Sequence, residues 1–298
     1  MNALPPRLLA PETLAGLANL ELVARSAVEG FLIGLHRSPR FGFSQEFAEY
    51  RAYVEGDDPR FVDWNVYART DRTYIRRYQG ETNTRLMILL DASASMGFSS
   101  TAVSKLQYAK FLAAALAYLA NKQHDPVGLL VFDETIRHYR PPSSRPDSLH
   151  GVLHALDTTV AGARTDLPGC FQRFREHLSR RGLVAVISDL YCDPIAMSRA
   201  VQPLAHRGHD IMIFQVLDPE ELRPSMKDSV LLEDMESGRT LEVSPQYMAG
   251  SYRERLEVHL SALKQAAASV GADQMLVDTS QPLDRALNQY LHFRQRRH

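Results

Sequence analysis

The sequence has little of what marks a secreted, membrane-spanning or nucleic-acid-binding chain. Only two cysteines occur, Cys170 and Cys192, and they form no metal-ligand spacing, so we expect reduced thiols. No apolar run approaches the roughly 18 residues of a membrane-spanning helix, and the longest, residues 111–120, is followed by Asn121 and Lys122. The formal net charge of −1 gives no support for binding to nucleic acid or to a membrane surface.

The N-terminal segment also lacks the features of a targeting signal. It carries Pro5 and Pro6 and has no basic region followed by an apolar core. We therefore expect a soluble, cytoplasmic protein without membrane insertion. Apolar residues make up 45% of the 298 residues, which is enough for a domain of roughly 200 residues plus a smaller module.

From residue 85 onward, short apolar runs alternate with segments that have helical periodicity. The runs predict strands over 86–90, 127–132, 183–187, 211–217 and 274–277. The intervening segments predict helices over 102–122, 147–156, 166–180, 194–207, 252–270 and 282–294. A strand over 135–139 and a hairpin over 230–243 are also expected. This alternation predicts an α/β fold with a doubly wound, mostly parallel sheet flanked by helices.

The first 82 residues differ in composition and apolar patterning from the rest. Apolar positions between Leu17 and Leu32 predict a short amphipathic helix. Residues 36–80 are dense in arginine, aspartate and aromatic side chains, with prolines and glycines between them, and a strand is expected at Tyr74–Tyr78. We therefore predict a small N-terminal module over residues 1–82 and a main domain over residues 83–298.

The stretch that suggests chemistry is 86–97, where an apolar run ends at Asp91 and is followed by Ser93 and Ser95. Asp91 is expected at the carboxyl end of a buried strand, the edge at which open α/β sheets bind ligands. Carboxylate and hydroxyl oxygens suit a hard divalent cation such as Mg²⁺. Alternatively, Asp91 caps a turn and the serines satisfy backbone donors; the stretch by itself does not decide between the two.

Two later segments place further oxygen ligands at the same edge. Asp189 follows the strand predicted over 183–187, and Thr165 precedes a predicted helix. Each residue alone is equally explained as a turn or helix-capping residue. A doubly wound sheet, however, brings the loops that carry these side chains to one edge, and the predicted set is Asp91, Ser93, Ser95, Thr165 and Asp189.

The pattern Asp-x-Ser-x-Ser after a strand, a later threonine and a strand ending in Ile-Ser-Asp resembles the von Willebrand factor A domain. The resemblance covers roughly residues 83–293 and includes the family's metal-ion-dependent adhesion site. It implies that Ser93 and Ser95 bind Mg²⁺, or Mn²⁺ or Ca²⁺, directly. It also implies that Thr165 and the two aspartates ligate directly or through water. Arg164 beside this site either attracts an acidic partner or points to solvent.

A second resemblance is carried by the upstream segment. Its motif consists of Glu46-Phe47, Tyr50, Arg51, Tyr53, Gly56–Trp64, Ala68-Arg69 and Glu81. It resembles a bacterial family filed as domain of unknown function number fifty-eight, which is often associated with MoxR-type AAA+ ATPases. This implies such an ATPase as a partner. We favour a structural role for Gly56–Trp64 over a second binding site, with a turn, an Arg60–Asp63 ion pair, and Trp64 buried against the main domain.

Individual residues argue against other kinds of catalytic or binding site. The sequence has no phosphate-binding Gly-x-x-x-x-Gly-Lys loop and no Gly-x-Ser-x-Gly elbow. His150 and His154 have the spacing of a helical zinc pair, but Gly151 stands where a general-base glutamate is needed, so we expect them on a helix surface.

We therefore predict a protein that is not an enzyme. The expected role is a metal-dependent adaptor acting with a MoxR-type AAA+ ATPase in chaperone-like remodelling or assembly of a client that offers an acidic side chain. One alternative is a metal-dependent phosphohydrolase with Asp91 as nucleophile, although Ser93 occupies the place of the usual second acid. Another is a structural subunit without metal.

Overall fold

The structure, a computed structural model, describes most of the chain and divides it into two compact units. The described residues are 10–17, 19–36, 47–53, 62–64, 66–67, 72–78, 85–162, 164–174 and 181–296. One unit combines Met1–Phe31 with Thr84–His298, and the other consists of Leu32–Asn83. This division differs from the predicted one of 1–82 and 83–298, because the first 31 residues belong with the main unit.

The main unit is built on a six-stranded sheet in the order β10-β7-β6-β3-β4-β5. The strands are β3 (Leu86–Asp91), β4 (Val127–Phe132), β5 (Ile136–Ser143), β6 (Leu183–Ser188), β7 (Asp210–Leu217) and β10 (Asp273–Asp278). All neighbouring strands pair in parallel except β4 and β5, which are antiparallel. The predicted doubly wound, mostly parallel sheet is therefore confirmed.

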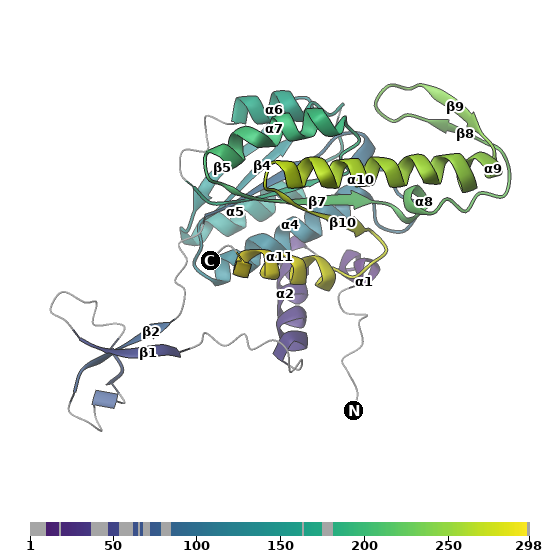
Figure 1. The fold of residues 1–298 in the computed structure, drawn as a ribbon. Helices are drawn as coiled ribbons and strands as arrows, with labels where there is room; N and C mark the ends of the chain where they lie inside the picture. Colours follow the sequence, from purple (N-terminus) through teal and green to yellow (C-terminus); the bar gives the residue numbers. More distant parts are fainter. Residues whose placement is uncertain are drawn as a thin grey trace. The chain divides into compact units, whose positions relative to one another are not determined.

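Helices cover both faces of this sheet (Figure 1). One face carries α6 (Leu167–Phe174), α7 (Pro194–His206) and α10 (Arg253–Ser269), and the other carries α4 (Lys105–Lys122), α5 (Pro146–Asp157) and α11 (Asp284–Arg296). Every residue of β3, β4 and β6 is buried, as expected for strands covered on both sides. The part of the predicted helix 166–180 that follows Phe174 lies outside the described residues.

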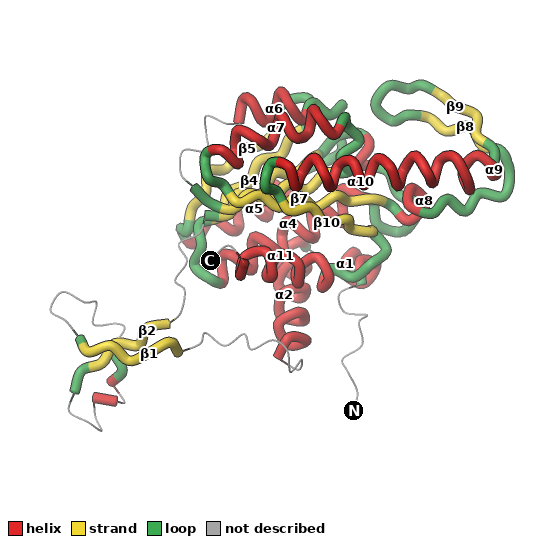
Figure 2. The backbone as a smooth tube through the Cα atoms, in the orientation of Figure 1, coloured by secondary structure: helices red, strands yellow, loops and turns green. Residues whose placement is uncertain are grey.

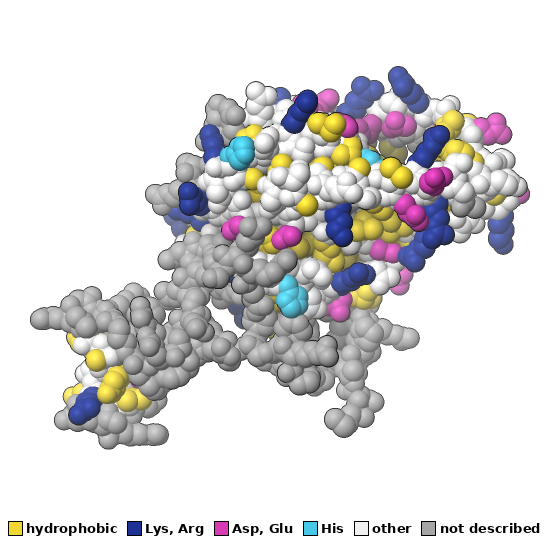
Figure 3. Space-filling view, in the orientation of Figure 1, with side chains coloured by type: hydrophobic (Ala, Val, Ile, Leu, Met, Phe, Trp, Pro, Cys, Tyr) yellow, Lys and Arg dark blue, Asp and Glu magenta, His cyan; other side chains and the backbone are white. Residues whose placement is uncertain are grey.

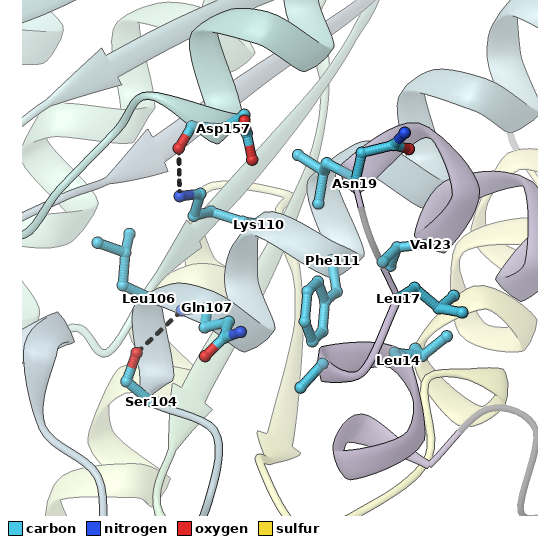
Figure 4. A pocket seen from close by; sticks show the side chains of 12 residues that line it. Leu14, Leu17, Asn19, Val23, Ser104, Leu106, Gln107, Lys110, Phe111 and Asp157 are labelled. Atoms are coloured by element: carbon cyan, nitrogen blue, oxygen red, sulfur yellow. Dashed lines mark hydrogen bonds between the residues drawn. The ribbon is translucent and has the colours of Figure 1, made fainter.

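The N-terminal helices pack on the main unit through α4. The elements are α1 (Pro11–Ala15) and α2 (Leu20–His36), and Leu14 and Val23 are buried. Their side chains and those of α4, including Phe111, line a cavity of about 280 Å³ (Figure 4). On its polar side the Lys110 ammonium donates to the Asp157 carbonyl at 2.9 Å. This apolar contact explains why the first 31 residues belong to the main unit.

In the smaller unit, β1 (Phe47–Ala52) pairs with β2 (Tyr74–Tyr78) in antiparallel fashion. The predicted strand Tyr74–Tyr78 is confirmed, whereas β1 was not predicted. The Trp64 side chain is 61% exposed and lies edge-on to the Tyr67 ring at 6.0 Å. Burial of Trp64 against the main domain concerns a contact between the two units and stays a prediction. Arg60, expected to pair with Asp63, lies outside the described residues.

Between β7 and α10 the chain forms a hairpin that stands beside the outer end of α10 (Figure 2). The elements of this segment are α8 (Pro219–Leu222), β8 (Val230–Glu233), β9 (Thr240–Val243) and α9 (Pro245–Tyr247). A short π-helical turn at Met248–Tyr252 then leads into α10. The hairpin matches the one predicted over 230–243, and most of its side chains are exposed.

The surface shows no segregation of charge on the face drawn in Figure 3. There, lysine and arginine side chains are interspersed with aspartate and glutamate over the main unit, as the net charge of −1 suggests. His150 and His154 are exposed on α5, as predicted. Within the described ranges, none of the helices has the length and apolar character needed to cross a bilayer.

The close packing of β4 against β5 predicts the effect of a single methyl group. A Cβ on Gly128 would lie 2.7 Å from both the Met87 sulfur and the Pro142 nitrogen. Overpacking of this kind costs about 1–3 kcal/mol. We expect Gly128→Ala to lower the Tm by several degrees in a circular dichroism melt, since about 1 kcal/mol shifts the Tm of a chain this size by roughly 2–4 °C.

Gly250→Ala is the matched control, because a Cβ there would meet nothing within 4 Å. It should leave the Tm unchanged or raise it slightly, because alanine is favoured over glycine in a helical turn. Equal melting temperatures for the two variants would show that β5 can shift at Pro142 to accommodate the added methyl group without loss of stability.

Candidate functional site

The topology of the sheet creates the site where β3 meets its two neighbours. From β3 the chain continues to β4 on one side, and β6 later joins β3 on the other side. This reversal of strand order is the topological switch point at which doubly wound sheets bind ligands. β3 and β6 run in parallel register up to the pair Leu90 and Ile187. The two strand ends, with Asp91 on one and Ser188-Asp189 on the other, therefore lie side by side.

Asp91 is a fully buried carboxylate at the end of β3. Its Oδ1 accepts a hydrogen bond from the Ser93 amide at 2.9 Å, and its Oδ2 accepts one from the Ser188 hydroxyl at 2.6 Å. Burial, and then the charge of Asp189, raise the pKa of Asp91 to about 7 against the opposing effect of these hydrogen bonds. The ionised carboxylate is thus poorly compensated by the chain itself.

The two serines lie next to each other in the turn after Asp91. Their hydroxyl oxygens are 3.1 Å apart. Ser93 is buried, and Ser95 begins a short 3₁₀ helix over Ser95–Gly97 and is half-buried. The structure thus brings the carboxylate and both hydroxyls of the predicted Asp-x-Ser-x-Ser group together in one turn.

Asp189 is also buried, but it already has a cationic partner. Its Oδ2 accepts a hydrogen bond from the Lys105 ammonium at 2.8 Å, and the same ammonium lies 2.7 Å from Oε1 of Glu221. The Lys105 side chain is fully buried and lies 4.9 Å from the centre of the Tyr191 ring. Burial lowers the pKa of Lys105, but the two carboxylates outweigh it and raise the pKa overall, so this residue is charged.

Thr165 lies on the loop beside the Asp91 turn, since the Gly162 amide donates to the Ala92 carbonyl at 2.7 Å. Its hydroxyl, however, donates to Oε1 of Glu236 at 3.0 Å, and its amide donates to Oε2 at 3.3 Å. Glu236 belongs to the tip of the β8–β9 hairpin. Arg164 is exposed, and its Nε donates to the Glu236 carbonyl at 3.0 Å.

The donor chemistry of this edge fits a hard divalent cation. With Asp91 ionised, three carboxylates lie at this edge, and the Lys105 ammonium pairs with two of them, Asp189 and Glu221, which leaves a formal charge of −2. In the described part of the chain, no group of three His, Cys, Asp or Glu side chains is arranged to hold a metal. An ion at this edge would therefore depend on hydroxyl as well as carboxylate oxygens, a donor set that suits Mg²⁺.

Sequence reasoning missed the partners that these residues have elsewhere in the chain. Lys105 looked like one more residue of a predicted helix, and its place one residue before the apolar stripe at Leu106 was the only hint of burial. Glu221 and Glu236 belong to no sequence motif that would mark them as partners of Lys105 and Thr165. The sequence pattern assigns Ser188 no role beyond ending a strand, although its hydroxyl donates to Asp91.

Comparisons with known proteins identify the family. The family described as "Protein of unknown function DUF58" matches residues 49–266. The uncharacterized proteins Mb1516 of Mycobacterium bovis and Rv1480 of Mycobacterium tuberculosis are each 31% identical over 237 residues, which cover 78% of this chain and 74% of each relative.

Among crystal structures, the chain is similar to an aerotolerance-related membrane protein from Bacteroides fragilis, with 19% identity and a TM-score of 0.49 over 70% of this chain and 98% of that one. It is also similar to BatB from Bacteroides thetaiotaomicron, with 16% identity and a TM-score of 0.46 over 70% of this chain and 97% of that one. The family match and the mycobacterial relatives carry the identification: as its upstream motif predicts, the chain belongs to the DUF58 family.

Proposed function

We propose that this protein is a non-enzymatic adaptor that binds Mg²⁺ at the end of β3 and, through the ion, an acidic side chain of a partner. The observation that carries the proposal is the environment of Asp91, a fully buried carboxylate whose pKa is raised to about 7 beside the hydrogen-bonded hydroxyls of Ser93 and Ser95. Burying a charge without a counter-ion is costly. A cation at this edge would remove that cost, because the hydrogen bonds that Asp91 accepts from the Ser93 amide and the Ser188 hydroxyl come from neutral groups.

In this proposal Ser93 and Ser95 hold the ion through their hydroxyls. Asp91, Thr165 and Asp189 bind it directly or through water. The ion supplies a positive charge to which a carboxylate of the partner can bind. Because the edge has a formal charge of −2 without the ion, loading brings it close to neutrality and converts a surface that repels acids into one that accepts them.

Lys105 has a positioning role in this arrangement. Its ammonium fixes Oδ2 of Asp189 at 2.8 Å, while Oδ1 of that carboxylate accepts a long hydrogen bond from the Tyr191 amide at 3.5 Å. Without this ammonium the three carboxylates at the edge would carry one more uncompensated negative charge. Lys105 therefore permits Asp91 and Asp189 to lie at neighbouring strand ends.

The partner class comes from the family. Resemblance to a family often associated with MoxR-type AAA+ ATPases supports such an ATPase as the partner, and remodelling or assembly of a client protein as the task. A phosphohydrolase reaction at Asp91 is disfavoured because both oxygens of this carboxylate accept hydrogen bonds within the core, from the Ser93 amide and the Ser188 hydroxyl. Ser93 also stands where a second acid would be needed.

Metal binding is tested by thermal melts in EDTA and in Mg²⁺. Mg²⁺ at about 100 times its dissociation constant should stabilise the wild type by about 2.7 kcal/mol, and Asp91→Ala should lose this gain. In EDTA at neutral pH we expect Asp91→Asn to melt higher than the wild type. Because its folded pKa lies above the unfolded value of about 4, ionised Asp91 destabilises the folded protein increasingly as the pH rises toward 7.

Asp228→Asn serves as the control, since Asp228 is an exposed acid. It should respond to Mg²⁺ as the wild type does. Equal stabilisation of wild type and Asp91→Ala by Mg²⁺ would place the ion elsewhere.

Partner binding is tested by interferometry with the cognate MoxR-type ATPase. We expect binding in Mg²⁺ and a loss of about tenfold or more, roughly 1.4 kcal/mol, in EDTA and for the double variant Ser93→Ala/Ser95→Ala. The serine variant is preferable to Asp189→Ala, which would leave the buried Lys105 ammonium underpaired and destabilise the fold. Ser269→Ala, on the exposed side of α10, is the matched control.

Undiminished binding in EDTA and by the double serine variant would show that the ATPase docks away from the metal edge, the proposed site formed by Asp91, Ser93, Ser95, Thr165 and Asp189. Absence of binding by the wild type in Mg²⁺ would contradict the adaptor role itself.

A further inference from the structure

The tip of the β8–β9 hairpin places an acidic side chain against the candidate metal edge. Glu236 accepts two hydrogen bonds from Thr165, one from its hydroxyl at 3.0 Å and one from its amide at 3.3 Å. Thr165 is one of the five residues proposed to hold the ion. A carboxylate of this chain thus lies one hydrogen bond away from a proposed metal ligand.

The contact is built into the loop. The Asp234 side chain accepts hydrogen bonds from the amides of Glu236 at 2.8 Å and Ser237 at 3.2 Å, which fixes the turn that presents Glu236. Arg164, next to Thr165, holds the Glu236 carbonyl at 3.0 Å. A methyl group on Gly97, at the end of the Asp91 turn, would lie 3.7 Å from the terminal carbon of Met235. The loop therefore touches the edge at several points.

The hairpin behind this loop is weakly anchored. Each of its strands has four residues, and Leu231 and Leu241 are 67% and 60% exposed. Isolated two-stranded hairpins are at best marginally stable in water. The loop can therefore leave the edge at little cost to the rest of the fold.

The charges at the edge suggest a function for the contact between Glu236 and Thr165. Without an ion, Glu236 adds a further negative charge to an edge whose formal charge is already −2. With a divalent cation present, the same edge is near neutral and can accept one carboxylate. Glu236 supplies that carboxylate from within the chain.

We propose that Glu236 is a built-in acidic ligand of the metal edge, occupying the place that a partner's acidic side chain takes. The hairpin then covers the loaded edge until the partner's carboxylate displaces Glu236. This inference rests on the proposed function, because it requires the ion.

The test compares Glu236→Gln with Glu242→Gln, a conservative change of an exposed acid on the same hairpin. Calorimetric titration with Mg²⁺ should show about tenfold weaker binding for Glu236→Gln and no change for Glu242→Gln, since removing one group of a metal site costs about this factor. Acetate, at constant ionic strength against chloride, should restore part of the lost affinity in Glu236→Gln and have no effect on the wild type.

Hydrogen exchange gives a second readout that does not depend on affinity. Mg²⁺ should slow amide exchange over residues 234–239 in the wild type and in Glu242→Gln, but not in Glu236→Gln. Exchange in the strands of the main sheet reports whether each variant is folded.

The outcomes separate the two proposals. If the wild type binds Mg²⁺ but Glu236→Gln binds it equally well or better, Glu236 is no ligand, and the metal edge stands without it. If Mg²⁺ leaves exchange of the hairpin unchanged in the wild type while still binding, the covering role is wrong. If the wild type binds no Mg²⁺, the metal edge and the inference both fall.

Discussion

The buried ammonium of Lys105 is the interaction on which the candidate site depends. It connects the start of α4 with Asp189 at the end of β6 and with Glu221 in α8, at 2.8 Å and 2.7 Å. Breaking a buried pair of this kind by removing one partner costs about 3–5 kcal/mol. The Lys105 ammonium therefore acts as a fixed counter-charge. It lets two carboxylates lie at adjacent strand ends while the edge as a whole stays negative.

That residual charge links the fold to the proposed role. The switch point in strand order brings the ends of β3 and β6 together, and burial and then the charge of Asp189 raise the pKa of Asp91. In the proposed role, a hard cation would satisfy the two hydroxyls and the carboxylates at once. Glu236 would control access to the ion, because an acid held inside the chain would compete with an acid from outside for the same position.

The strands and the turn after Asp91 could be predicted from local sequence pattern, whereas contacts between distant segments could not. The strands 127–132 and 74–78 have the predicted bounds, because apolar runs and punctuating residues act over short distances. Asp91, Ser93 and Ser95 are close because they share one turn. The ties from Thr165 to Glu236 and from Asp189 to Lys105 join segments far apart in the chain, which no periodicity reports.

The central claim is that a divalent cation sits between the end of β3 and the neighbouring loops. Crystals of the protein soaked in Mn²⁺, which can replace Mg²⁺ and scatters anomalously, test it most directly. We expect an anomalous peak at bonding distance from the hydroxyl oxygens of Ser93 and Ser95, with Asp91 bound to the ion directly or through one water, and we expect the peak to be lost in crystals of Asp91→Ala. A peak only at other positions, or no peak at saturating Mn²⁺, would contradict a cation at this edge.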